Sequence, residues 1–459
     1  MTTDLRVQLR ELGAVMDEAQ AALTAEDVRP RVVPVVMHPP GALPQTGSRR
    51  WLVALAAAVV VLVVAGGAAF LFRATGLGTP VATTPPATPQ SLGTWSRVPH
   101  NEAVFGGEDR QAMSSVAVGG PGLVAVGSDE GDAMVLTSVD GVTWSRVPYD
   151  ETVFGGSSMS SVTAWGSGLV AVGSDVGIFD DVPDLAEDEG DAVVWTSVDG
   201  ITWSRVPHDE EVFGAAFMNN VIVGGPGLVA VGGTDWHRTN GDAVVWTSVD
   251  GITWSRVAHD ETIFGGPKSQ TMYDVVVGSP RLVAVGREGD DHAWDNSHDN
   301  AAAVWTSVDG INWTRVPHDE TVFGTGGNPR TPTSPGPVMV SVTAGGPGLV
   351  AVGRKALWTS PDGITWTRIA DDVTARSFMT GVTAGGPGLV AVGLGGSGAT
   401  AVLTSVDGIT WSQAPGDDAV FGWYPDWIHD VTVGGPGLVA VGYAGGDAAV
   451  WVWVAATED

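Results

Sequence analysis

Three residue pairs with hydrogen-bonding side chains interrupt a repetitive sequence at equivalent positions. They are Asn219–Asn220, Tyr273–Asp274 and His429–Asp430, where other copies of the repeat carry small residues. Four tryptophans also fall outside the repeated pattern, namely Trp236, Trp294, Trp423 and Trp427. Aromatic rings beside carboxylates suit sugar binding, because rings stack on the sugar while carboxylates bond its hydroxyl groups. We therefore expect these residues to line a ligand pocket; drift among the copies is the alternative explanation.

Acidic residues gather in the segments that connect the repeated runs. Six of these segments contain Asp150–Glu151, Asp209–Glu211, Asp260–Glu261, Asp319–Glu320, Asp371–Asp372 and Asp417–Asp418. If they share one face, that face carries a concentrated negative field that would attract a cationic protein partner. Oxygen-rich clusters also suit Ca²⁺, and no other cofactor is expected. His292 and His298, within an acidic loop, form a further candidate metal site. Solvated loops that aid solubility are the alternative.

The element that must position these residues is a glycine-rich turn followed by a short apolar run. Seven copies of this pattern occur, close to Gly-Gly-Pro-Gly-Leu-Val-Ala-Val-Gly, at residues 119–127, 165–173, 224–232, 278–286, 345–353, 385–393 and 434–442. Pro followed by Gly favours a type II turn, because glycine tolerates the positive φ that this turn requires. The repeat therefore predicts short strands joined by tight turns.

A second repeated run contains Asp-Gly and ends in tryptophan. Six copies occur, at Ser138–Trp144, Ser197–Trp203, Ser248–Trp254, Ser307–Trp313, Ser360–Trp366 and Ser405–Trp411. Asp-Gly between two β-rich runs predicts a hairpin. Each copy thus offers four strand-like runs, and a four-stranded unit that recurs every ~45–60 residues is typical of a propeller blade.

The last unit is split between the two ends of the repeat region. Its C-terminal part supplies only three strands, Ile428–Val433, Leu438–Val441 and Ala448–Val454, whereas Thr94–Val98 matches a fourth strand without its first three. Pairing these ends would remove both free edges. We therefore expect residues 93–459 to form an all-β, seven-bladed β-propeller with a split closing blade; six blades with a frayed end are the alternative.

The tryptophan-ended runs resemble the Asp-box, or BNR repeat, of sialidase-like propellers, whose pattern is Ser-x-Asp-x-Gly-x-Thr-Trp. Here one residue is missing between Asp and Gly. The resemblance implies a structural role, with each aspartate accepting main-chain N–H bonds inside its hairpin and each tryptophan packing between blades. The aspartates at this position are Asp140, Asp199, Asp250, Asp309, Asp362 and Asp407.

The same resemblance implies tests for a glycan-active enzyme. Sialidases use a tyrosine nucleophile and an arginine trio, preceded by an Arg-Ile-Pro-type motif. That motif is missing here, and only four tyrosines are present. Arg281, Arg287 and Arg354 lie outside the repeated pattern and cannot be assembled into a trio from the sequence. A glycan-active hydrolase is therefore the second hypothesis, after a non-catalytic binding protein.

The composition and the N-terminal segments predict the setting. The formal net charge is −30, so nucleic acid is not an expected partner. Residues 51–72 carry no charge and are long enough to span a bilayer as one helix. Arg49 and Arg50 precede this segment, which predicts a cytoplasmic N-terminus and an extracellular propeller. The expected order is a cytoplasmic amphipathic helix (1–28), a Pro-rich linker (29–50), the transmembrane helix (51–72), a Thr/Pro-rich stalk (73–92) and a monomeric propeller (93–459).

An N-terminal helix with leucines at helical spacing also permits a third hypothesis. The protein would then be a surface sensor coupled to a cytoplasmic partner through residues 1–28. A solvated or membrane-surface helix is the alternative for this segment.

Overall fold

Runs of β-branched and small apolar residues, each ended by a glycine turn, fold into antiparallel strands in the computed structural model. The structure describes residues 93–107, 110–175, 190–234, 241–289, 300–324, 336–369, 377–396, 398–414, 418–422 and 426–456. The all-β class expected from the sequence is confirmed. The segments expected as a cytoplasmic helix and a membrane span lie outside these residues. Among the described residues, no helix is long and apolar enough to cross a membrane.

The strands form consecutive four-stranded antiparallel units. The first holds β2 (Gln111–Gly119), β3 (Gly122–Asp129), β4 (Asp132–Ser138) and β5 (Trp144–Arg146). The second holds β6 (Ser158–Trp165), β7 (Gly168–Ser174), β8 (Ala192–Ser197) and β9 (Trp203–Arg205). The third holds β10 (Phe217–Gly224), β11 (Gly227–Gly233), β12 (Ala243–Ser248) and β13 (Trp254–Arg256). The fourth holds β14 (Ser269–Val277), β15 (Leu282–Gly289), β16 (Ala301–Ser307) and β17 (Trp313–Arg315).

Two further units share one continuous sheet through a single residue pair, Arg354 with Phe378. One holds β18 (Val338–Gly345), β19 (Gly348–Arg354), β20 (Leu357–Ser360) and β21 (Thr367–Ile369). The other holds β22 (Phe378–Gly385), β23 (Gly388–Leu394), β24 (Thr400–Ser405) and β25 (Ser412–Gln413). The last unit joins both ends of the region and holds β26 (Trp427–Gly434), β27 (Gly437–Ala444), β28 (Asp447–Ala455) and β1 (Gly93–Arg97).

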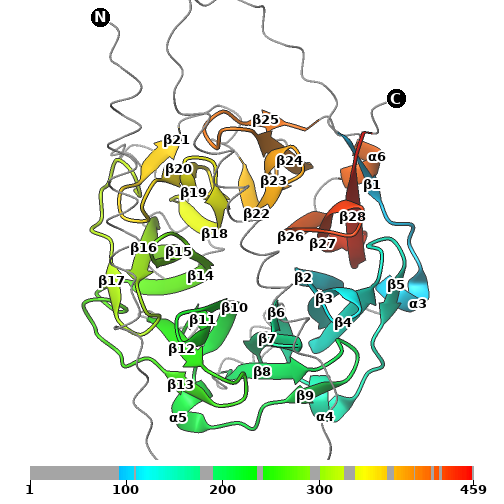
Figure 1. The fold of residues 1–459 in the computed structure, drawn as a ribbon, viewed down its shortest axis with the longest axis horizontal. Coiled ribbons are helices and arrows are strands. Elements are labelled where there is room, and N and C mark those ends of the chain that lie inside the picture. Colours follow the sequence, from blue (N-terminus) through cyan, green and yellow to red (C-terminus); the bar gives the residue numbers. More distant parts are fainter. Residues whose placement is uncertain are drawn as a thin grey trace, which may run out of the picture. The chain divides into compact units, whose positions relative to one another are not determined.

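The units follow one another in sequence order around a common centre (Figure 1). The first strand of each unit lies nearest the centre, and each first strand contacts the first strand of the next unit, with β26 contacting β2. β1 pairs with β28 from Gly93 opposite Ala455 to Arg97 opposite Trp451. The chain therefore closes through a strand from each end.

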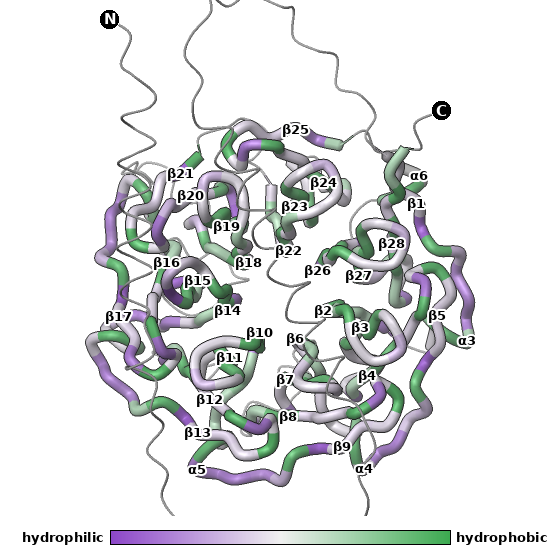
Figure 2. The backbone as a smooth tube through the Cα atoms, viewed as in Figure 1, coloured by the Kyte–Doolittle hydropathy of each residue, from purple (hydrophilic) through white to green (hydrophobic). Residues whose placement is uncertain are grey.

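The cores lie between successive units rather than within one. In β3, Leu123 and Ala125 pack in a cluster with residues of β27 and β28, whereas Val124 and Val126 pack against β6 and β7. Each second strand is thus buried on both faces, which explains its uninterrupted apolar sequence. Hydrophilic residues follow the outer loops beside α3 and α5, and apolar ones follow the inner strands (Figure 2).

Four single-turn helices precede first strands, namely α3 (Glu102–Phe105), α4 (Glu151–Phe154), α5 (Glu210–Phe213) and α6 (Asp418–Phe421). These helices could not be predicted from the sequence, because four residues are too few to produce helical periodicity. A fully buried tryptophan anchors three of these turns, α4, α5 and α6, to a third strand. Nε1 of Trp195, Trp246 and Trp451 donates to the carbonyl oxygens of Val153, Val212 and Val420, each at 2.7 Å.

Adjacent units also meet at their glycine turns. Gly200, in the second Asp-Gly hairpin, has a φ of +78°, and an added Cβ would lie 3.0 Å from Cδ of Pro121 in the preceding unit. Glycine is therefore required there both by conformation and by space.

Candidate functional site

Each innermost strand carries a β-bulge at the position where the sequence departs from its repeat. The register shifts by one residue in all seven strands, and the extra residues are Ser114, Ser160, Asn219, Tyr273, Val340, Thr380 and His429. A bulge re-aims the side chains around it. The three pairs singled out above therefore occupy equivalent places on strands that surround the centre.

Side chains of the extra residues bond to the next unit. Asn219 Nδ2 donates to the Met272 carbonyl at 2.8 Å, and Thr380 Oγ1 donates to the Ile428 carbonyl at 2.7 Å. His429 Nδ1 lies 2.9 Å from the Met113 carbonyl. Because a carbonyl oxygen only accepts, Nδ1 must carry the proton in this bond.

The residue after each bulge supplies an acceptor to the next unit in four places. Ser161 and Ser341 accept the N–H groups of Val221 and Val382, each at 3.3 Å. Asp274 Oδ2 accepts the Val342 N–H at 2.8 Å, and Asp430 Oδ2 accepts the Val116 N–H at 2.9 Å. These bonds link first strands across the unit boundaries.

Asp274 and Asp430 use their second oxygen as well. Oδ1 of Asp274 accepts the Val275 N–H, and Oδ1 of Asp430 accepts the Val431 N–H, both at 2.7 Å. Each oxygen of the two carboxyl groups thus accepts a main-chain N–H, which fixes the orientation of both groups.

Burial shifts the ionisation of all three central groups. The pKa of Asp274 is raised to about 7, mainly by desolvation and in part by the charge of Asp430. Desolvation also raises the pKa of Asp430. It lowers the pKa of His429 to about 4, so that the imidazole is neutral at pH 7.

Trp427 and His429 lie in one row of aromatic rings. The ring centroids are 5.2 Å apart for Phe378 and Trp427, 5.9 Å for Trp427 and His429, and 5.5 Å for His429 and Tyr443. Arg110 lies over the Tyr443 ring at 4.2 Å. The structure therefore brings together Trp427 and His429, which were both selected from the sequence. The aromatic row that contains them runs from β22 through β26 to β27.

Other sequence-selected residues cannot be placed in this way. Trp236, Trp294, Trp423, His292 and His298 lie outside the described residues. Asn220 is described and partly exposed on β10, and its Oδ1 has no hydrogen-bond partner among the described residues.

The aspartates of the tryptophan-ended runs organise their own hairpins. Asp199 Oδ1 accepts the N–H groups of Ile201 and Thr202 at 2.8 and 2.6 Å, and Trp203 Nε1 donates to the Gly200 carbonyl at 3.0 Å. The same double acceptance occurs at Asp140, Asp250, Asp309, Asp362 and Asp407. Main-chain N–H donors lower the pKa of Asp140, Asp250 and Asp407 to about 2.

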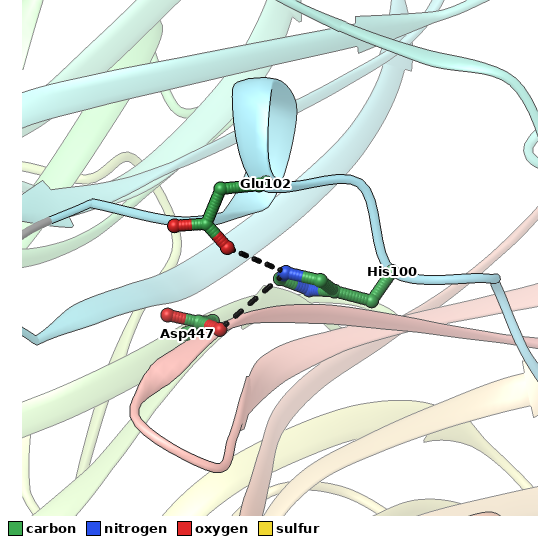
Figure 3. A group of neighbouring side chains, drawn as sticks. All are labelled: His100, Glu102 and Asp447. Atoms are coloured by element: carbon green, nitrogen blue, oxygen red, sulfur yellow. Dashed lines mark hydrogen bonds and ion pairs between the residues drawn. The ribbon is translucent and has the colours of Figure 1, made fainter.

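A different set of side chains converges where the third strand of a unit begins and the fourth strand ends, away from the Asp-Gly hairpin that joins these two strands. His100 follows the fourth strand β1, Glu102 begins α3, and Asp447 begins the third strand β28 (Figure 3). Nε2 of His100 lies 3.1 Å from Glu102 Oε2 and 3.6 Å from Asp447 Oδ2. One imidazole nitrogen and two carboxylates therefore face a common point.

The same His–Glu–Asp cluster recurs at the corresponding place in two other units. His208 Nε2 lies 3.2 Å from Glu210 and 3.4 Å from Asp191, and His259 Nε2 lies 3.1 Å from Glu261 and 3.6 Å from Asp242. We call these three groups, His100–Glu102–Asp447, Asp191–His208–Glu210 and Asp242–His259–Glu261, the rim clusters.

Neighbouring groups hold the rim clusters in place. Asp191 Oδ1 accepts the Ala215 N–H at 2.8 Å, which leaves Oδ2 facing His208. Glu261 Oε1 accepts the Gly266 N–H at 3.1 Å, which leaves Oε2 facing His259. Each histidine ring also lies beside a phenylalanine of the following turn, with centroids 6.3–6.4 Å apart.

The rim clusters were not predicted from the sequence: Glu210 and Glu261 stood out as acidic loop residues, but Glu102 and the histidine and aspartate partners did not. The signal was present as a Pro/Ala-His-Asx-Glu motif after the fourth strand, together with Gly-Asp-Ala before the third. Strands three and four run antiparallel, so the start of one lies beside the end of the other. That topology places the two motifs together.

Comparisons with known proteins give no family. No protein-family model and no curated protein sequence matches this chain. Among solved structures, it is similar to the computationally designed Ika8 protein, with 12% identity and a TM-score of 0.40, covering 76% of this chain and 98% of that one. It is also similar to Zg3597, a family 117 glycoside hydrolase of the marine bacterium Zobellia galactanivorans, with 10% identity and a TM-score of 0.32, covering 50% and 76%.

Proposed function

We propose that residues 93–459 form a seven-bladed β-propeller that acts as a non-catalytic binding module with an acidic ligand face. Support for the blade count comes from the seven four-stranded units and from the ordered contacts of their first strands, which return from β26 to β2. The pairing of β1 with β28 supports a split closing blade. The hairpin bonds of the six aspartates agree with the resemblance to Asp-box repeats.

The observation that carries the binding role is a separation of charge between the surface and the interior. The rim glutamates are highly exposed, at 75% for Glu102, 80% for Glu210 and 69% for Glu261. The arginines of the fourth strands point inward instead. Arg146 pairs with Asp129 and Arg315 with Glu288, and their side chains are only 25% and 18% exposed. The negative charge therefore faces solvent, while the repeated positive charge is used within the fold.

The opposite face of the units has a different character. Each Asp-Gly hairpin carries one aspartate, whose carboxylate accepts main-chain N–H groups of its own hairpin, and exposes apolar side chains, including Val139, Val198, Val249, Val308 and Val406 at 68–81%. We call the face that carries the rim clusters and the loops after the fourth strands the rim face. A cationic ligand would therefore dock on the rim face, where the exposed glutamates are concentrated.

A hydrolytic role has less support. The central pair Asp274 and Asp430 resembles an acid–base pair in its raised pKa values, but all four oxygens accept main-chain N–H groups. A general acid or base needs an oxygen directed at the substrate. We assign both residues to the linkage between units.

The proposed setting is the outer surface of a cell membrane. Residues 51–72 would anchor the chain as one helix, residues 1–28 would lie in the cytoplasm, and residues 73–92 would extend the propeller from the surface. Coupling of residues 1–28 to a cytoplasmic partner is a secondary proposal that rests on the sequence pattern alone.

Binding of a basic protein to the full chain tests the proposed function. We expect cytochrome c to bind with an affinity that falls steeply with salt, because exposed charges are screened within about 10 Å at 0.1 M ionic strength. The rim variant replaces five glutamates with glutamine, at Glu102, Glu151, Glu210, Glu261 and Glu320, and should weaken binding at least tenfold.

A matched control separates the rim face from net charge. Adding Val139→Glu, Val198→Glu, Val249→Glu, Val308→Glu and Val406→Glu to the rim variant restores its net charge on the opposite face. We expect binding to stay weak. Recovery of binding in this control, or no loss in the rim variant, would refute an acidic ligand face.

A further inference from the structure

We propose that the three rim clusters are Zn²⁺ sites, each formed by one histidine nitrogen and two carboxylates with an open coordination position. This inference goes beyond the proposed function, because it assigns a metal to specific residues and does not require a protein partner.

The geometry of the donor atoms fits this metal. Zinc bonds to nitrogen and oxygen of about 2.0–2.2 Å at tetrahedral angles place neighbouring ligand atoms about 3.3–3.6 Å apart. The separations from Nε2 to the two carboxylate oxygens are 3.1 and 3.6 Å in the His100 cluster. They are 3.2 and 3.4 Å around His208. All three donor atoms of each cluster lie within 4.8 Å of one another, so a modest closing of the two carboxylates would complete the site around an ion.

The donor set selects zinc over the Ca²⁺ considered from the sequence. Ca²⁺ takes six to eight oxygen ligands, whereas imidazole nitrogen suits zinc and other first-row transition metals. Three protein ligands leave one tetrahedral position open, as in catalytic and ligand-exchanging zinc sites. The histidines are 38–47% exposed, so this position faces solvent.

The surroundings of one cluster indicate what the open position could hold. Asp242 and His259 line a surface pocket together with Arg256 and Phe264. An anionic oxygen ligand, such as a carboxylate, could bind the metal and the arginine at once. Capture of such a group would complement the attraction of the rim for cations.

Other units provide natural comparisons within the same chain. In the first unit, Tyr149 stands where the clusters have histidine, and its hydroxyl bonds to Asp132 beside Glu151. In the fourth, His318 pairs with Glu320 at 3.1 Å, but Ala301 stands at the position of the aspartate. A phenol is a poorer zinc ligand than an imidazole, and the alanine side chain supplies no donor atom. These two units should therefore bind zinc weakly or not at all.

Isothermal titration of the full chain with ZnCl₂, purified without a histidine tag, tests the inference. We expect His100→Ala, His208→Ala and His259→Ala each to lower the stoichiometry by one ion. His318→Ala is the matched control and should leave it unchanged. Tyr149→His should raise it by one, because Asp132 and Glu151 already flank that position. Circular dichroism verifies that each variant is folded.

The outcomes separate the metal from the general acidic face. The histidine variants keep every rim carboxylate, so they should lose zinc while still binding cytochrome c with unchanged affinity. Unaltered zinc stoichiometry in the triple histidine variant, or displacement of the zinc by a tenfold excess of Ca²⁺, would overturn the zinc assignment and leave the proposed function standing.

Discussion

Asp274 should make the stability of this protein fall as pH rises from 5 to 8. Its pKa is raised from 3.8 to about 7 in the folded chain. Between these two values the folded state holds a proton that the unfolded state has released, so the unfolding free energy decreases with rising pH. Replacement by asparagine removes this titration while keeping the shape of the side chain.

The size of the effect follows from the two pKa values of 3.8 and about 7. Each pH unit between them is worth about 1.36 kcal/mol. Titration from pH 5 to pH 8 then costs the wild-type protein about 3 kcal/mol through this one carboxyl group. Asp274→Asn also loses one acceptor for a main-chain N–H, which costs about 1–3 kcal/mol at every pH. The variant should thus be less stable than the wild type at pH 5, and equally stable or up to about 2 kcal/mol more stable at pH 8.

Urea unfolding at pH 5 and pH 8, followed by tryptophan fluorescence, measures this difference. Asp199→Asn is the control, because the pKa of Asp199 is lowered and its titration lies below pH 5. That variant should be destabilised equally at both pH values. Equal destabilisation of Asp274→Asn at pH 5 and pH 8 would show that Asp274 does not titrate in this window, and the reasoning from burial would fail.

Three other predictions concern the hairpins, the centre and the tryptophan anchors. Asp250→Ala should destabilise the protein at neutral pH, and the difference should vanish towards pH 2, because the pKa of Asp250 is lowered from 3.8 to about 2. His429→Gln should reduce the loss of stability between pH 6.5 and 4 by at most about 3 kcal/mol, because the wild-type imidazole stays neutral until about pH 4 while the unfolded one is protonated. Trp246→Phe should cost about 1–3 kcal/mol, because the Val212 carbonyl loses its donor. Urea titrations check all three, and a pH-independent effect of Asp250→Ala or His429→Gln, or a neutral Trp246→Phe, would contradict them.

The strand pattern was predictable because local chemistry determines it. A glycine-rich turn recurs in all seven copies and an Asp-Gly turn in six, and the predicted strand Ile428–Val433 differs from β26 by one residue at each end. The match of Thr94–Val98 to a fourth strand likewise indicated a partner at the other end of the region, and β1 pairs with β28.

The site was less predictable because it depends on contacts between distant residues. His429–Asp430 stood out in the sequence, but nothing local indicated a bulge or bonds to Met113 and Val116 in another unit. Asp447 likewise carries no local sign that it faces His100, since the two meet only when the last unit closes. A motif search that paired the start of each third strand with the end of each fourth would have found the rim clusters.

The pairing of β1 with β28 has a consequence for how the chain is made and folded. Arg97 and Ala444, which are bonded across this sheet, lie 347 residues apart. Contacts of such long range form late, because the entropy of closing the loop must be overcome first. The strand β1, which is synthesised first, can therefore pair with β28 only after the last strand has been made. Until then β1 has no strand partner and another chain could pair with it, so a stalled or truncated product that lacks β28 should aggregate through β1.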